Sequence, residues 1–212
     1  MKTQAQISAI IEELKQLYPD ALCSLEYQKD YELLFSVRLA AQCTDARVNL
    51  VTPALFERFP TLEAFAAATP DEVGEYVRSC GFWRAKAKDI VGSAQMLLHD
   101  FGGKVPDNMD DLLRLPGVGR KTANLVLGDI YGKEGYVCDT HCIRITGRLG
   151  ITDGSKDPLK VEQQLRKVIP SEESNNFCHR MVLHGRALCM ARGPKCEECP
   201  LKALCDYCAS RQ

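Results

Sequence analysis

The sequence predicts an all-α protein, and three observations support this prediction. In most segments apolar residues recur every three to four positions, as they do on the buried face of a helix. No segment shows the sustained alternation of apolar and polar residues that is typical of a half-buried strand. Helix-start patterns recur along the chain, and Thr69-Pro70-Asp71-Glu72 is one of them, a capping box with proline at the first helical position.

We expect about ten helices with short connections. Asp45 is the expected cap of the third helix, and Thr52-Pro53 indicates a kink or a fresh start, because proline is not tolerated inside a helix. The elements expected after the first amphipathic helix are, by residue number, 30–41, 45 onward, 61–65, 70–77, 84–101, a helix that ends at about 115, 120–131, 140–149, 158–168 and 172–190.

Composition indicates a globular protein. The chain has 212 residues, of which 45% are hydrophobic, enough for a sizeable core. It contains no apolar run long enough to span a membrane and opens without a signal-type apolar block, so we expect a cytoplasmic protein with no membrane partner. Eleven cysteines, concentrated near the C-terminus, favour metal or cluster binding over disulfides.

The charge distribution bears on nucleic-acid binding. A formal net charge of −1 argues weakly against it, since dedicated nucleic-acid binders are usually basic. However, residues 112–148 hold six Lys and Arg against three Asp and Glu, and residues 179–212 hold the same numbers. These two segments have the positive charge needed to neutralise backbone phosphates.

A tight turn at Pro116-Gly117-Val118-Gly119 separates two helical patterns, which predicts a helix-hairpin-helix over about residues 107–131. Glycines allow the hairpin backbone to approach a ligand, and the N–H groups at the start of the second helix favour an anion. Gly117, Val118, Gly119 and Arg120 are therefore candidate phosphate-binding residues. The alternative is an ordinary connection between helices.

Lys121 and Asp139 are candidates for a shared site. A helix from Arg120 to Tyr131 rises roughly 18 Å, and the eight residues that follow span up to about 26 Å, so the chain can bring Asp139 back beside Lys121. A lysine is nucleophilic only when neutral, and a helix N-terminus with a neighbouring cation favours that form. The alternatives are a solvated lysine and, for Asp139, a simple helix N-cap.

Four cysteines near the C-terminus have metal-ligand spacing. Cys189, Cys196, Cys199 and Cys205 follow the pattern C-x6-C-x2-C-x5-C, which suits either tetrahedral zinc or a [4Fe-4S] cluster. Cys208 is a spare thiol that can be mistaken for the fourth ligand. Arg192, Lys195 and Lys202 would place cations around this site; the remaining cysteines are expected to be buried small apolar residues.

The sequence LPGVGRKTA, the following Asp139-Thr140-His141 and the four-cysteine tail together resemble the endonuclease III branch of the helix-hairpin-helix DNA glycosylases. The resemblance covers nearly the whole chain. It implies two helical domains with the active-site cleft between them. Residues 22–132 would form a helical barrel with the hairpin, and residues 1–21 with 133–212 a discontinuous iron–sulfur domain.

The resemblance also implies an activity. The protein is expected to act as a monomer in base excision repair on double-stranded DNA, removing oxidised pyrimidines and cleaving the abasic site. Lys121 would attack C1′ and form a Schiff base, and Asp139 would stabilise the developing cation. The four cysteines would hold a [4Fe-4S] cluster.

Base flipping leaves a gap in the duplex that a side chain must fill. By resemblance, Gln42 and Phe82 are the candidates, although relatives often have leucine where this chain has Phe82. Packing in the core is the alternative for Phe82 and for Trp83. His141 would contact phosphate or orient Asp139, or is a plain residue at a helix start.

Two other functions are compatible with parts of the sequence. A monofunctional mismatch glycosylase, specific for adenine or thymine, would share the fold but lack the catalytic lysine. A non-catalytic DNA-binding or redox-sensing module would use the hairpin and the cluster alone. The presence of Lys121 favours the bifunctional enzyme.

Overall fold

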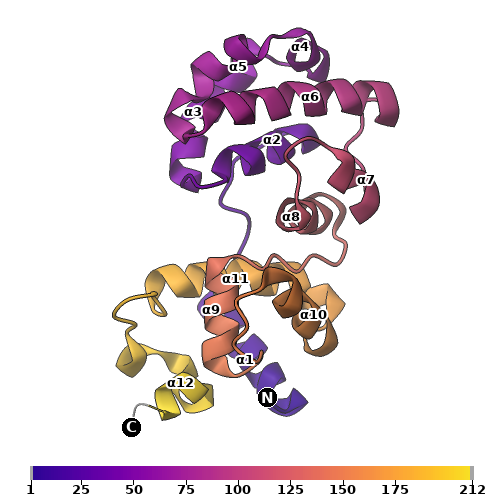
Figure 1. The fold of residues 1–212 in the computed structure, drawn as a ribbon. Coiled ribbons are helices and arrows are strands. Elements are labelled where there is room, and N and C mark those ends of the chain that lie inside the picture. Colours follow the sequence, from indigo (N-terminus) through magenta and orange to yellow (C-terminus); the bar gives the residue numbers. More distant parts are fainter. Residues whose placement is uncertain (1, 211–212) are drawn as a thin grey trace. The chain divides into compact units, whose positions relative to one another are not determined.

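The computed structural model describes residues 2–210, and its regular structure is helical throughout that range, as the sequence predicted. The described chain forms two compact units, one from residues 23–131 and the other from residues 2–22 together with 132–210. The colours in Figure 1 show that the second unit combines both ends of the chain, because the indigo first helix packs among orange and yellow segments. Within residues 2–210, the protein has no helix that is both long enough and apolar enough to cross a membrane.

The 23–131 unit is built around its longest helix, α6. Helices α4 and α5 pack along one side of α6, and α2 packs on the other (Figure 1). Phe35 and Phe65 form the centre of the aromatic core, with ring centroids 5.0 Å apart. The elements are α2 (Asp30–Ala40), α3 (Asp45–Arg58), α4 (Leu62–Ala67), α5 (Pro70–Val77), the 3-10 turn η1 (Arg78–Cys80), α6 (Trp83–Phe101), α7 (Met109–Arg114) and α8 (Arg120–Tyr131).

Helix α3 corrects two details of the sequence prediction. Its N-cap is Thr44, whose hydroxyl accepts a hydrogen bond from the first turn, and Asp45 is the first helical residue. Pro53 lies inside the helix, which does not start afresh there. Proline removes one backbone hydrogen bond, but burial of neighbouring side chains such as Leu55 stabilises the helix across this position.

The turn between α7 and α8 rests on a partly buried ion pair. Arg38 of α2 donates from Nε to Asp89 Oδ2 of α6 at 2.7 Å. Gly117 lies directly over this pair, since a Cβ there would be 2.4 Å from Arg38 Nε and 2.6 Å from Asp89 Oδ2. Gly117 also has φ 72°, which favours glycine. Ser93 of α6 donates to the Pro116 carbonyl at 3.1 Å, so α2 and α6 together fix the hairpin.

The second unit packs α9 and α1 against α11. Lys15 of α1 forms an ion pair with Glu173 at the start of α11, with 2.5 Å between Nζ and Oε1. The elements are α1 (Gln4–Leu17), α9 (Thr140–Leu149), α10 (Pro158–Val168), the 3-10 turn η2 (Ser171–Glu173), α11 (Ser174–Ala187), the 3-10 turns η3 (Cys196–Glu198) and η4 (Pro200–Leu204), and α12 (Asp206–Ala209).

We expect Gly117→Ala to lower the free energy of unfolding of the 23–131 unit by about 2 kcal/mol, because the left-handed φ and the contact with the ion pair both oppose a side chain. Gly119→Ala is the matched control, since a Cβ there meets nothing within 4 Å. Urea unfolding followed by fluorescence of Trp83, the single tryptophan, reports on this unit. Equal destabilisation by the two substitutions would contradict this account of the turn.

Candidate functional site

The hairpin exposes backbone at the start of α8. Val118 N donates to Leu115 O at 3.1 Å, and Ala123 N donates to Gly119 O at 2.9 Å, which closes the first turn of the helix. Gly119 is exposed and faces open space, so packing within the protein does not explain its missing side chain. This position leaves room for a ligand to approach the backbone and the positive end of the helix.

Lys121 is the second residue of α8, and its side chain is exposed. Within residues 2–210 the Lys121 ammonium makes no hydrogen bond or ion pair, so no other group of the protein ties it to one position. Arg120, immediately before it, is also exposed. The start of α8 therefore combines an available amine, a second cation and the helix N-terminus, an arrangement that favours an anionic ligand.

Asp139 is the N-cap of α9, as the sequence predicted. Its Oδ1 accepts a hydrogen bond from Cys142 N at 2.7 Å, and its side chain is half-buried. Lys121 belongs to the 23–131 unit and Asp139 to the other unit, so their action on one nucleotide stays a prediction.

A cluster of thiols supports the segment around Asp139. The Cys142 thiol is hydrogen-bonded to Cys138 and Cys178, and all three residues are buried, as expected of small apolar residues. The contact with Cys138 is the main reason that the pKa of Cys142 is raised, and burial adds to it. These thiols pack the start of α9 against α11.

His141 joins α9 to α11 and to the cysteine-rich tail. Its Nδ1 accepts a hydrogen bond from Arg144 at 3.0 Å, because a guanidinium can only donate. Arg144 donates in turn to the Cys189 carbonyl at 3.0 Å. The ring lies so close to Gly185 that a Cβ there would be 2.2 Å from Nδ1. These contacts fix the first turn of α9.

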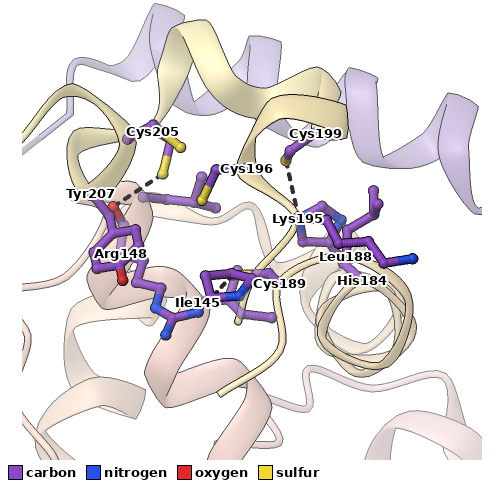
Figure 2. A pocket seen from close by; sticks show the side chains of 13 residues that line it. Ile145, Arg148, His184, Leu188, Cys189, Lys195, Cys196, Cys199, Cys205 and Tyr207 are labelled. Atoms are coloured by element: carbon purple, nitrogen blue, oxygen red, sulfur yellow. Dashed lines mark hydrogen bonds between the residues drawn. The ribbon is translucent and has the colours of Figure 1, made fainter. Parts of the chain in front are cut away.

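Cys189, Cys196, Cys199 and Cys205 line one small cavity (Figure 2). Among residues 2–210, no three His, Cys, Asp or Glu side chains converge as the ligands of a single metal ion do. Four cysteines around one cavity are a ligand set that suits tetrahedral zinc or a [4Fe-4S] cluster. Cys208 also borders the cavity and is hydrogen-bonded to Cys205 and Cys196.

Two side chains that the sequence analysis did not identify contact these cysteines. Arg148 of α9 donates to Cys189 Sγ at 3.2 Å, and its guanidinium lies 4.6 Å from the centre of the Tyr207 ring. His184 Nε2 lies 3.6 Å from Cys199 Sγ, and burial lowers the pKa of this histidine to about 4, so that it is neutral. Both are long-range contacts, and no local sequence pattern indicates them.

Gln42 and Phe82 share an unusual backbone conformation. They are the two non-glycine residues of the described chain with positive φ, at 55° and 45°. Phe82 is 70% exposed, which excludes the core-packing alternative. Trp83 is half-buried, and its ring lies against Gly74, where a Cβ would be 2.5 Å from the ring. The structure therefore presents Phe82, and not Trp83, as the exposed aromatic residue of this loop.

Comparison with known proteins agrees with this geometry. Residues 35–171 match the HhH-GPD superfamily of base excision DNA repair proteins, and residues 189–205 match the iron–sulfur binding domain of endonuclease III. The chain is 49% identical over 193 residues to endonuclease III of Synechocystis sp., which covers 91% of this chain and 88% of that protein.

Two solved structures extend the comparison. A trapped covalent intermediate of endonuclease III with DNA has a TM-score of 0.93 and 42% identity, covering 100% of this chain and 99% of the other. A thermostable thymine-DNA glycosylase has a TM-score of 0.85 but 20% identity, covering 97% and 98%, and so shares the fold alone. By identity over most of its length, the chain belongs to the endonuclease III family of helix-hairpin-helix base excision DNA repair proteins.

Proposed function

We propose that this protein removes oxidised pyrimidines from double-stranded DNA and cleaves the resulting abasic site through a Schiff base on Lys121. Membership of the family makes it a DNA-binding enzyme of base excision repair, a DNA glycosylase and abasic-site lyase. The observation that carries the proposal is the exposed amine of Lys121 at the start of α8, directly after the hairpin. The covalent endonuclease III–DNA intermediate is consistent with such a nucleophile.

Lys121 would act through its neutral amine. The amine attacks C1′ of the damaged nucleotide and displaces the base, and the ammonium formed loses a proton. The nitrogen lone pair then expels O4′, which takes up a proton as the sugar ring opens, and a protonated imine is left. Abstraction of a proton from C2′ then expels the 3′ phosphate by β-elimination, which breaks the strand.

Asp139 would stabilise the positive charge that develops at C1′ as the glycosidic bond breaks. Its hydrogen bond with Cys142 N holds one carboxylate oxygen in place. A fixed anion needs no reorganisation during the reaction and is therefore an effective stabiliser of a developing cation. Capping α9 and stabilising the transition state are compatible roles of one carboxylate.

The remaining site residues would bind and distort the DNA. The exposed backbone of residues 117–119 and the Arg120 side chain would hold a phosphate, and His141 would contact a second one. Gln42 and Phe82 would fill the gap left by the flipped nucleotide. Phe82 suits this role because its exposed ring can stack on neighbouring bases.

The iron–sulfur site would hold a [4Fe-4S] cluster on Cys189, Cys196, Cys199 and Cys205. The matched iron–sulfur segment ends at Cys205, which leaves Cys208 outside it. The cluster would serve as a structural cross-link that fixes the C-terminal loops and their cations. We also propose that the enzyme acts as a monomer in the cytoplasm, where its eleven free cysteines would stay reduced.

The fold does not separate this proposal from a mismatch-specific glycosylase, since the thymine-DNA glycosylase shares it. Lys121 does separate them, because a monofunctional glycosylase needs no amine nucleophile. The first test is therefore directed at Lys121.

Lys121→Arg and Lys121→Ala should both abolish covalent trapping by borohydride on a duplex with one abasic site, because neither side chain can form the imine. Lys121→Arg keeps the positive charge and should bind the duplex within about threefold of wild type. Gel analysis of borohydride-treated mixtures measures trapping, and fluorescence anisotropy measures binding. A covalent band from either variant would show that another amine is the nucleophile.

Asp139→Asn should lower base excision about a hundredfold or more while leaving the stability of the fold within about 0.5 kcal/mol, because asparagine is an equally good N-cap. Asp139→Ala removes the cap as well, and should also cost about 1 kcal/mol of stability. Single-turnover excision and chemical denaturation measure the two effects. Full activity of Asp139→Asn would reduce Asp139 to a helix cap.

Cys205→Ser should lose the cluster, and Cys208→Ser should keep it, although the two thiols are neighbours. Iron and acid-labile sulfide are measured in anaerobically purified protein, together with the broad visible absorption of the cluster. The reverse result would assign the fourth ligand to Cys208. Stoichiometric zinc in a colourless, folded wild-type protein would exclude the cluster.

A further inference from the structure

The loop after α2 and the turn before α6 meet at a small buried junction that the proposed mechanism does not use. Lys86 of α6 is 1% exposed, and its ammonium donates to the carbonyls of Leu39 at 2.8 Å and Cys80 at 2.7 Å. Beside it, the thiols of Cys43 and Cys80 are hydrogen-bonded to each other. One lysine and one thiol pair therefore connect the two loops.

Both loops carry a strained residue next to this junction. Gln42 directly precedes Cys43, and Phe82 follows Cys80 by two positions. Each has a positive φ, which is an unfavourable backbone conformation for a residue other than glycine. A displacement of either sulfur is therefore transmitted over one or two residues to a side chain that we expect to enter the DNA.

The two thiols differ in access to solvent. Cys43 is partly exposed, whereas Cys80 is 1% exposed. The buried trio of Cys138, Cys142 and Cys178 also has thiols in contact, but none of its members reaches the surface to the same degree. Among these thiols in contact with one another, the pair at the loop junction is the one that a small oxidant reaches first.

Exposure and burial set the order in which the two thiols react. Cys43 is the thiol that a small oxidant reaches, so it suits the role of the attacking thiol. Burial raises the pKa of Cys80 to about 11, and the neighbouring Cys43 adds to the rise, whereas the cations of Lys86 and Arg47 oppose it. Cys80 is therefore slow to attack an oxidant in solution and suits the role of the resolving thiol, which attacks a sulfur beside it.

We propose that Cys43 and Cys80 are a thiol-oxidation site, at which a low-molecular-weight disulfide such as oxidised glutathione joins the two loops by a disulfide bond and slows base excision. The Cys43 thiolate attacks the oxidant and expels one glutathione thiolate. The Cys80 thiolate then attacks the Cys43 sulfur of the mixed disulfide and expels the second. One disulfide bond breaks and one forms, two protons leave the protein thiols, and two electrons pass to glutathione.

The bond slows excision because it moves the loops. Sulfur atoms in a disulfide lie about 2 Å apart, much closer than hydrogen-bonded thiols, so Cys43 and Cys80 must approach each other. The shift alters Gln42 and Phe82 together and removes their freedom to adjust independently to a flipped nucleotide. This effect rests on the proposed function of the two side chains, whereas formation of the bond does not.

The test incubates the cluster-loaded full chain with millimolar oxidised glutathione and then blocks free thiols. Peptide mass spectrometry without reduction should find Cys43 linked to Cys80 and the buried Cys138, Cys142 and Cys178 unlinked. Single-turnover excision from a duplex with an oxidised pyrimidine should fall about tenfold and recover after reduction by dithiothreitol. The visible absorption is followed throughout, to show that the cluster stays intact.

Cys43→Ala and Cys80→Ala are the matched controls, each compared with its own untreated sample, and neither should lose activity on treatment. Free Cys43 and Cys80 after treatment, or a link to other cysteines, would overturn the site. A Cys43–Cys80 link that leaves excision unchanged would overturn its effect on the reaction. Failure of the proposed function is distinguishable, because the reduced wild type would then be inactive while the link still forms.

Discussion

The ion pair between Arg38 and Asp89 is the contact on which the proposed DNA-binding site depends. It joins α2 to α6, and Gly117 of the hairpin lies directly against its two charged side chains. Because the hairpin rests on charged side chains at van der Waals distance, it can neither sink inward nor carry a side chain at this position. Helix α8 starts three residues after Gly117, so the ion pair also determines where the helix begins. The proposed nucleophile Lys121 is therefore positioned by backbone and not by contacts of its own side chain.

Local patterns predicted the parts of the structure that depend on neighbouring residues. The capping box at Thr69, the N-cap at Asp139 and the limits of α8 follow from residues a few positions apart. The fresh start considered at Pro53 was wrong, because burial of the surrounding helix outweighs the local preference of proline. Contacts between distant segments, such as Lys86 with the carbonyl of Leu39, were not predictable, since nothing near either residue in sequence indicates its partner.

Helix α9 connects Asp139, the proposed catalytic carboxylate, with the cysteine cavity of the second unit. Asp139 caps its first turn, and Arg148 in its last turn donates to Cys189 Sγ. The ten residues of this helix rise about 15 Å, so a single rigid element connects the proposed catalytic carboxylate with the cysteine cavity. His141 and Arg144 add a second connection through α11 and the Cys189 carbonyl. Loss of the cluster would thus release contacts that hold α9, which explains how a structural cluster can matter for a reaction elsewhere.

The loops that carry Gln42 and Phe82, like the hairpin, are held in place by contacts with residues distant in sequence. Gln42 and Phe82 adopt conformations that their own chemistry disfavours, so distant contacts must maintain them. Lys86 provides such contacts, because its buried ammonium donates to the carbonyl of Leu39 at the end of α2 and to that of Cys80 before α6, although burial lowers its pKa and disfavours the charge. A buried cation is retained where its hydrogen bonds outweigh desolvation. Here those bonds hold the turn that carries the exposed ring of Phe82. In our proposal, the neighbouring thiols of Cys43 and Cys80 make this arrangement sensitive to oxidation.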